Sequence, residues 1–337
     1  MNIWDLETDW DKNMKQVDRN DIQRIVINDI DKRLIEIKGG SYIEYRKEFD
    51  AARSHHIRPE RPIQLTIELN SWCNLRCKMC MWNYSKNPSK AYMPLEMIND
   101  IAKQAKDLKI PSIWLGAFNE ITLYPYFSKS LRKFSEAAPI DYWMSTNGTL
   151  LSKEISELII DIPLTKLSVS LDAANPETYK KIRGGNLEQV ERNIYRFFEI
   201  RENKRSKLPF LRLTFVEQEE NRNEYEQFVD KWKNLADIID LQKQVDFSYM
   251  KKHINEISIP ENNNFICYYP FYVVTIRHDG RFQPCCSGMY KSNNYLNIND
   301  MSISEYWGNT KTVKFADIID KRNYAGCCKR CVASIAL

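Results

Sequence analysis

The chain of 337 residues is long enough for about two domains of ordinary size, and 43% of its residues are apolar, as in globular proteins. Its 49 basic and 45 acidic residues nearly cancel, which gives no reason to expect binding to nucleic acid or to a membrane surface. No window approaches about 18 consecutive apolar residues, and the charged start lacks the apolar core of a secretory signal, so the sequence predicts a cytoplasmic protein.

Residues 1–60 are polar and mostly helix-forming, with an interruption at Gly39-Gly40. Pro59 and Pro62 then mark a boundary before the first strong strand pattern. We interpret this segment as an N-terminal helical extension.

Residues 61–242 alternate between strand and helix patterns. Six apolar runs have strand character: 63–69, 112–116, 142–146, 166–171, 210–216 and 237–242. Helical apolar spacing fills the stretches 95–108, 127–137, 152–160, 187–202 and 223–234. This alternation predicts an α/β fold of parallel strands joined by right-handed crossovers, a partial (β/α)6 barrel of the TIM type. A doubly wound open sheet is the alternative, although no glycine-rich dinucleotide fingerprint follows a strand.

Residues 243–337 differ in character from the barrel pattern. A linker with lysines and asparagines (243–266) leads to the run 273–284, which predicts a hairpin turning at Asp279-Gly280. The run 302–309 predicts one short helix. Because six of the nine cysteines follow residue 266, we expect a small cysteine-rich C-terminal domain here.

The other three cysteines, Cys73, Cys77 and Cys80, lie within one stretch of eight residues just after the first predicted strand. In a reducing compartment such groups are better explained by metal ligation or catalysis than by disulfides. The carboxyl end of a barrel strand is also where active sites of such folds are built. Three thiolates in one loop suit an iron–sulfur cluster with one open iron. Zinc, the alternative, normally needs a fourth ligand, and none of the four histidines lies within fifteen residues of Cys73.

The spacing of these three cysteines after a first strand resembles the radical S-adenosylmethionine (SAM) superfamily. The resemblance implies that Cys73, Cys77 and Cys80 hold a 4Fe–4S cluster whose open iron binds the amino acid part of SAM. An external one-electron reductant of the flavodoxin or ferredoxin type would feed the cluster. The electron would cleave SAM to methionine and a 5′-deoxyadenosyl radical, which abstracts a hydrogen atom from the substrate.

The resemblance also implies contacts between the cofactor and residues near the second strand and the cysteine loop. Met79 takes the place of a side chain that packs near the adenine. The run 116–121 stands where the family has a Gly-Glu-Pro stretch that contacts the amino group of the cofactor, and here only Glu120 matches. Plain core packing is the alternative interpretation of Met79.

Further cofactor contacts are implied beyond the third strand. Ser145 and Asn147 match cofactor-contacting positions, and Ser170 and Arg183 are expected near the ribose hydroxyls and the carboxylate. Asn147 precedes Gly148, so a simple turn is the alternative for Ser145 and Asn147. A surface position is the alternative for Arg183.

The C-terminal cysteines resemble the SPASM or twitch auxiliary-cluster domain of the same superfamily. Cys267 is followed after twelve residues by Gly280 and after four more by Cys285, and a Cys328-Lys-Arg-Cys331 motif comes later. The resemblance implies that these four cysteines hold a second, auxiliary 4Fe–4S cluster. A zinc site with four thiolate ligands is the alternative.

Cys286 and Cys327 remain, each next to an expected ligand. The ligand assignment could therefore shift by one residue within each pair. We interpret both as spare, and a sharper hypothesis makes one of them catalytic, as a donor of a hydrogen atom to a substrate radical.

A fully ligated auxiliary cluster has no open iron, so its expected use is to accept or relay an electron. This favours an oxidoreductase that modifies, for example by dehydrogenation, a sugar-like or other small metabolite. One alternative is a peptide-modifying enzyme that forms a crosslink, a thioether or an inverted α-carbon on a ribosomally made precursor. A non-catalytic zinc-stabilised protein is another. The sequence identifies no acid or base, although Glu68, Asn70 and Asp172 lie near strand ends.

Overall fold

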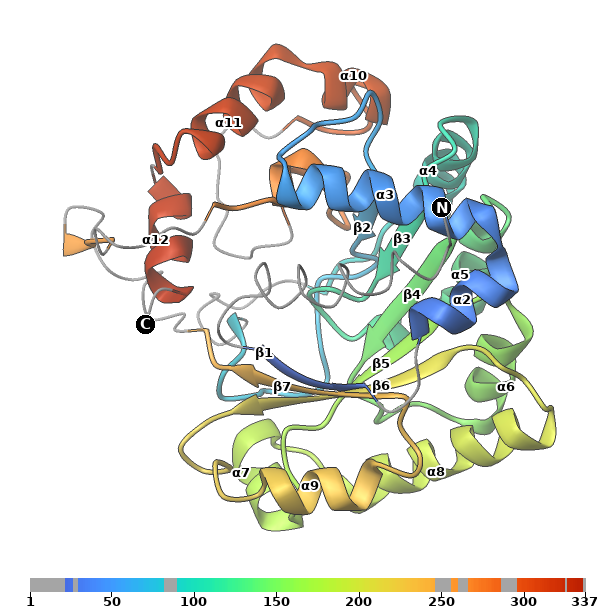
Figure 1. Ribbon diagram of the computed structural model, residues 1–337. Coiled ribbons are helices and arrows are strands. Elements are labelled where there is room, and N and C mark those ends of the chain that lie inside the picture. Colours follow the sequence, from blue (N-terminus) through green and yellow to red (C-terminus); the bar gives the residue numbers. More distant parts are fainter. Residues whose placement is uncertain are drawn as a thin grey trace, which may run out of the picture.

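The computed structural model describes residues 22–26, 30–81, 90–245, 256–259, 266–285, 296–324 and 326–335. Their strands form one sheet in the order β1-β7-β6-β5-β4-β3-β2-β8-β9. Figure 1 labels β1 to β7 of this sheet. The strands are β1 (Ile22–Val26), β2 (Gln64–Ile67), β3 (Ser112–Leu115), β4 (Asp141–Thr146), β5 (Lys166–Ser170), β6 (Phe210–Glu217), β7 (Ile238–Lys243), β8 (Val273–Ile276) and β9 (Phe282–Gln283).

Strands β2 to β7 are parallel, and each pairs with the next one along the chain. The helices between them are α4 (Leu95–Asp107), α5 (Phe127–Ser135), α6 (Lys153–Asp161), α7 (Pro176–Arg183), α8 (Leu187–Asn203) and α9 (Tyr225–Trp232), with a short 3-10 helix η3 (Ile121–Leu123). The strand order does not reverse within this set, as it would in a doubly wound sheet. The predicted partial barrel of six strands is therefore confirmed.

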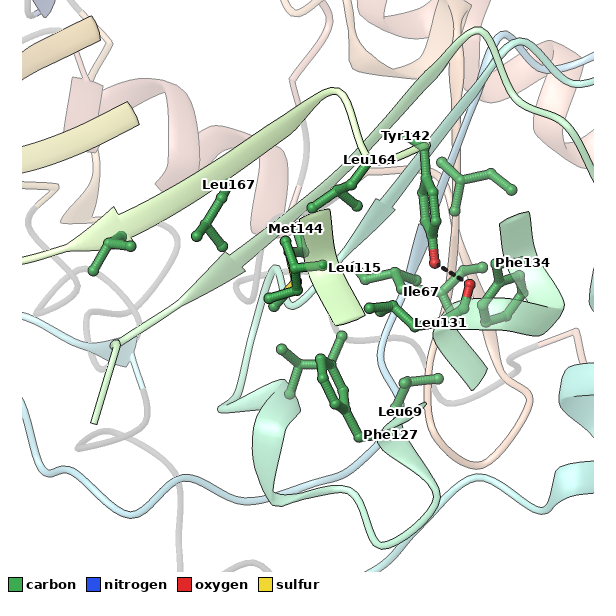
Figure 2. Packing of buried hydrophobic residues seen from close by; sticks show 14 of the residues in the cluster. Ile67, Leu69, Leu115, Phe127, Leu131, Phe134, Tyr142, Met144, Leu164 and Leu167 are labelled. Carbon is green, nitrogen blue, oxygen red and sulfur yellow. Dashed lines mark hydrogen bonds between the residues drawn. The ribbon is translucent and has the colours of Figure 1, made fainter. Parts of the chain in front are cut away.

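The outer face of these strands is apolar and packs against the helices. Figure 2 shows Ile67, Leu115 and Met144 from neighbouring strands beside Phe127 and Leu131 of α5, all buried. Such burial contributes roughly 1.5–3 kcal/mol per large side chain. This one-sided core leaves the inner face of the strands to line the interior of the barrel.

The N-terminal segment covers the end of the barrel at which the parallel strands begin. Helices α2 (Ile30–Lys38) and α3 (Gly40–Ser54) are separated at Gly39, whose φ of 63° suits glycine. Tyr42 and Tyr45 of α3 pack in one cluster with Ile63 and Phe210, which lie at the amino ends of β2 and β6. Strand β1 was not predicted; it pairs antiparallel with β7.

The C-terminal segment extends the same sheet. Strand β8 pairs in parallel with β2, and β9 returns antiparallel to β8, as the predicted hairpin requires. Gly280 has a φ of 82°, which favours glycine, and a Cβ there would lie 2.6 Å from Asn297 Oδ1. The predicted short helix is α10 (Ile303–Gly308), which begins with a capping box of Ser302 and Glu305.

The remaining elements of the described residues are η6 (Tyr269–Phe271), α11 (Thr310–Asp320) and α12 (Gly326–Ile335). Arg58, just after α3, ties this region to the N-terminal segment. Its Nη2 donates to the backbone oxygen of Trp307 at 2.6 Å, and its guanidinium lies 3.5 Å from the centre of the Trp307 ring. None of the described helices is both long and apolar enough to cross a membrane.

Candidate active site

The cysteine loop 73–80 lies at the carboxyl end of β2, and its three cysteines are half-buried. The backbone N–H of Lys78 donates to Ile182 O of α7 at 2.7 Å, and the Lys78 ammonium pairs with Glu220. Within the loop, the backbone N–H of Cys80 donates to Cys77 O at 3.0 Å. These contacts fix the loop against the ends of α7 and β6.

The three thiols lie close enough to influence one another. Burial raises the pKa of the Cys77 thiol to about 11; the Arg183 charge opposes this shift, while Cys80 and Cys73 add to it. Burial also raises the pKa of Cys73, although the Leu75 N–H opposes the change. A metal or cluster bound here would displace these protons, because the thiolate is the ligand.

No three His, Cys, Asp or Glu side chains in the described ranges are arranged to hold a single metal ion. Tetrahedral zinc draws its sulfur ligands to about 2.3 Å from one centre. A four-iron cluster instead binds each cysteine to a different iron, so its ligands stand farther apart. Loop 73–80 offers three cysteine ligands, which is one for each of three irons of such a cluster.

Arg183, at the end of α7, forms a buried ion pair with Asp172, which follows β5. Their side chains are 6% and 1% exposed, and Asp172 has a positive φ of 63°. Burial opposes ionisation of Arg183, but the charges of Cys77 and Asp172 outweigh it and raise the pKa of the guanidinium. Among the described residues, the buried Nε of Arg183 has no hydrogen-bond partner. The surface interpretation of Arg183 is therefore wrong, because Arg183 is 5% exposed.

Glu120 is 2% exposed and holds the ends of β3 and β4 together. Its Oε1 accepts from the Thr122 and Thr146 hydroxyls at 2.6 and 2.7 Å. Its Oε2 accepts from the backbone N–H of Asn147 at 2.6 Å. Both carboxylate oxygens are thus engaged within the protein, and the contact of Glu120 with the cofactor stays a prediction.

Ser145 and Ser170 line a cavity of about 920 Å³ inside the barrel. Trp114 and Trp143 stack on one another in its wall, with ring centres 4.4 Å apart, and Trp114 Nε1 donates to Ser145 Oγ at 3.1 Å. The Lys166 ammonium lies 4.2 Å from the centre of the Trp143 ring. The wall therefore combines hydroxyl groups, indole rings and a positive charge.

Ser145 and Ser170 of this wall were predicted from the sequence, whereas its other polar residues on β5 and β6 were not, although the sequence holds a signal for them. Lys166, Ser168 and Ser170 alternate along β5 with Leu167 and Val169, and Arg212 and Thr214 do the same on β6. A polar inner face is what this period of two indicates in a strand whose other face is apolar. Within the wall, Arg212 pairs with the fully buried Asp240. The Nε of Arg212 donates to Asp240 Oδ2 at 2.7 Å.

Three residues predicted to contact the cofactor differ in their surroundings. Met79 is half-buried in the loop, between Cys77 and Cys80. Asn147 is 4% exposed, and its Nδ2 lies 3.7 Å from Cys73 Sγ. Ser170 lies in the cavity wall at the end of β5.

The C-terminal cysteines Cys267, Cys285, Cys328 and Cys331 are half-buried. Burial raises the pKa of Tyr324 to about 12, and the charges of Cys267 and Cys328 contribute to the rise. The fold thus brings cysteines 61 positions apart to one tyrosine, and Cys331 lies on the same helix α12 as Cys328. Cys286 and the side chain of Cys327 lie outside the described residues, so their predicted roles stay predictions.

A second buried charge cluster, also missed from the sequence, connects β2 with β8. Glu68 accepts from Arg277 Nε at 2.6 Å and Nη2 at 3.1 Å, and His278 Nδ1 lies 2.9 Å from its Oε2. Burial raises the pKa of Glu68, but the hydrogen bond from His278 and the charge of Arg277 outweigh burial and hold this pKa low. Glu68 is therefore a structural carboxylate at the mouth of the barrel.

Two protein-family models match the chain. Residues 67–231 match the radical SAM superfamily, and residues 267–332 match an iron–sulfur cluster-binding domain, SPASM. The chain belongs to the radical SAM superfamily. Its cofactors are 4Fe–4S clusters and SAM, and the C-terminal region of this radical SAM enzyme is a SPASM-type domain.

Relatives cover this radical SAM enzyme to different extents. A tungsten-containing aldehyde ferredoxin oxidoreductase cofactor-modifying protein from Pyrococcus furiosus is 25% identical over 296 residues, 77% of this chain and 81% of the relative. A probable GTP 3′,8-cyclase from Methanococcus aeolicus is 31% identical over 138 residues, 40% of this chain and less than half, 46%, of that relative.

Solved structures share the fold. SuiB from Streptococcus suis bound to SAM has a TM-score of 0.59 at 15% identity, over 86% of this chain and 76% of SuiB. The same protein bound to its precursor peptide SuiA has a TM-score of 0.56 at 16% identity, over 88% and 75% of the two chains.

Proposed function

We propose that Cys73, Cys77 and Cys80 hold the SAM-binding cluster and that Arg183 binds the carboxylate or ribose of SAM beside it. The buried Nε of Arg183, which lacks a hydrogen-bond partner among the described residues, carries this proposal. An unsatisfied buried donor costs about 1–3 kcal/mol, and an anionic or hydroxyl-bearing ligand would remove that cost. The electrostatic interaction of Arg183 with Cys77 supports a position next to the cluster.

The residues present suit such a cofactor. A 4Fe–4S cluster bound here would supply the electron that cleaves SAM, and the resulting 5′-deoxyadenosyl radical would take a hydrogen atom from the substrate. The Ser145 and Ser170 hydroxyls offer hydrogen bonds from the cavity wall. Met79 offers an apolar surface to the adenine. The barrel helices and the apolar outer face of the sheet exclude water from the sides of the cavity.

We propose that Cys267, Cys285, Cys328 and Cys331 hold the auxiliary 4Fe–4S cluster. Both Cys267 and Cys328 raise the pKa of Tyr324, which supports the proposal that these two cysteines lie near one another. Four protein ligands leave no iron for the substrate, so this cluster would serve to accept or relay an electron, from an external ferredoxin- or flavodoxin-type reductant or from the substrate.

The reaction we propose is a redox modification, such as dehydrogenation, of a sugar-like or other small polar metabolite. The cavity supports this choice because its wall presents Ser168, Ser170 and Thr214 hydroxyls together with Lys166 and Arg212. Helices α2 and α3 cover the cavity at the amino ends of the strands. A substrate would therefore enter from the opposite end, on the side of the cysteine loop. A small polar molecule can satisfy such a wall by hydrogen bonds.

A peptide substrate is the second candidate, because SuiB bound to its precursor peptide has the same fold. A single residue of a ribosomally made precursor would then enter the cavity from its open end. The two candidates differ in the size of the molecule that must reach the wall.

The test adds cell-extract fractions to the reconstituted, reduced enzyme with SAM and measures 5′-deoxyadenosine. We expect the low-molecular-mass fraction to raise its formation above the uncoupled rate, and Ser168→Val in the wall to reduce this gain at least several-fold. The exposed Lys103→Met variant serves as the control. Stimulation by the peptide fraction alone would contradict the small-metabolite proposal and favour the peptide.

A further inference from the structure

Asn147, at the end of β4, directs its side-chain amide at the cysteine loop. Its Nδ2 is 3.7 Å from Cys73 Sγ and 2.8 Å from Asn74 Oδ1. The backbone N–H of Leu75 also donates to Cys73 Sγ, at 3.4 Å. The sulfur that we propose as an iron ligand therefore faces two N–H donors.

Neighbouring groups fix the orientation of the Asn147 amide. Thr149 donates from its backbone N–H and from its hydroxyl to Asn147 Oδ1, at 2.9 and 2.7 Å. A backbone N–H can only donate, so the atom that it faces must be the amide oxygen, and the NH₂ group must face Cys73. Because Glu120 also holds the backbone N–H of Asn147, the protein itself sets the direction of this donor.

We propose that Asn147 is a positioning residue that raises the reduction potential of the SAM-binding cluster by donating its amide N–H to Cys73 Sγ. This inference rests on the proposed function, since Cys73 must be an iron ligand. Taking up one electron makes a cluster and its thiolates more negative, and an N–H donor to sulfur stabilises the more negative state. An external reductant can then load the cluster at a less negative potential.

Two substitutions separate this effect from simple damage to the turn. Asn147→Leu removes the N–H at similar size, and Asn147→Asp keeps the oxygen that Thr149 contacts while replacing the NH₂ group. The matched control is Asn193→Leu. Asn193 Nδ2 donates to Gly148 O and Thr149 O, at 2.8 and 3.1 Å, and so supports the same turn without contacting the sulfur.

The measurement is a redox titration of the full-length, reconstituted enzyme, followed by electron paramagnetic resonance. The signal that changes on addition of SAM reports the open-iron cluster, which distinguishes it from the auxiliary one. We expect both Asn147 variants to keep their iron and to have a more negative midpoint, so that less than half of this cluster is reduced at the wild-type midpoint. Asn193→Leu should titrate as the wild type does.

An unchanged midpoint in Asn147→Leu and Asn147→Asp would overturn the inference, as would an equal shift in Asn193→Leu. If Asn147→Leu fails to retain iron, the midpoint of Asn147→Asp decides the matter. A wild-type enzyme with no SAM-responsive signal is a different result, because it would overturn the proposed function itself.

Discussion

At the scale of single residues, the proposed SAM site depends on the buried pair of Arg183 and Asp172. Both side chains lie almost wholly out of water, which is costly unless each charge has its partner. The pair therefore holds Arg183 in place, and its Nε, which has no hydrogen-bond partner among the described residues, is the atom that we propose contacts SAM. Stability and cofactor binding should separate when the two residues are changed one at a time and together.

We predict that Arg183→Met destabilises the protein by about 3–5 kcal/mol, because it leaves the Asp172 carboxylate buried without its partner. Arg183→Met should also weaken SAM binding. Adding Asp172→Asn should recover much of the lost stability but none of the lost SAM affinity. Urea unfolding and equilibrium dialysis with SAM measure the two quantities under anaerobic conditions. The exposed Lys181→Met variant is the control. A double variant that binds SAM as tightly as wild type would show that Arg183 has only a structural role.

At the scale of elements, the six barrel strands could be predicted because each is a short apolar run between helical patterns. Strand β1 could not, because Ile22–Val26 includes Gln23 and Arg24 within a polar segment and becomes a strand by pairing with β7. The parallel pairing of β8 with β2 joins segments about two hundred positions apart, which no local pattern encodes.

The candidate site likewise has parts that could be predicted from local sequence and parts that could not. The spacing of Cys73, Cys77 and Cys80 was visible in the sequence, since all three belong to one loop. The pairing of Arg183 with Asp172 was not, because it depends on a left-handed backbone at Asp172 and on the packing of α7. The cavity wall was partly predictable. The alternation of polar and apolar residues along the strands indicates a polar inner face, but only the closed barrel shows that this face lines a cavity.

The contact of Glu68 with Arg277 and His278 joins β2 to β8, and we predict that it couples the two strands energetically. Glu68→Gln and Arg277→Met should each speed hydrogen exchange in β8, with a coupling in the double variant on the order of 0.5–3 kcal/mol. Mass spectrometry of exchange across 273–283 provides the measurement. Arg281→Met removes an exposed pair with Asp279 in the same hairpin and should have little effect. Additive single changes would contradict the coupling.

At the scale of the whole molecule, one sheet connects the two cysteine groups. The loop 73–80 follows β2, and β8, which pairs with β2, leads through β9 to Cys285. This arrangement places the SAM-binding region and the SPASM-type region on one continuous framework. An electron path between two clusters would benefit from such a fixed relation.

We propose that loop 73–80 holds a cluster with an open iron that cleaves SAM. The most direct test of this proposal is the release of 5′-deoxyadenosine by the anaerobically reconstituted, dithionite-reduced protein supplied with SAM. We expect release by the wild type and by Cys331→Ala, and loss of at least a hundredfold in Cys77→Ala. Equal release by Cys77→Ala, or none by an iron-loaded wild type, would contradict it.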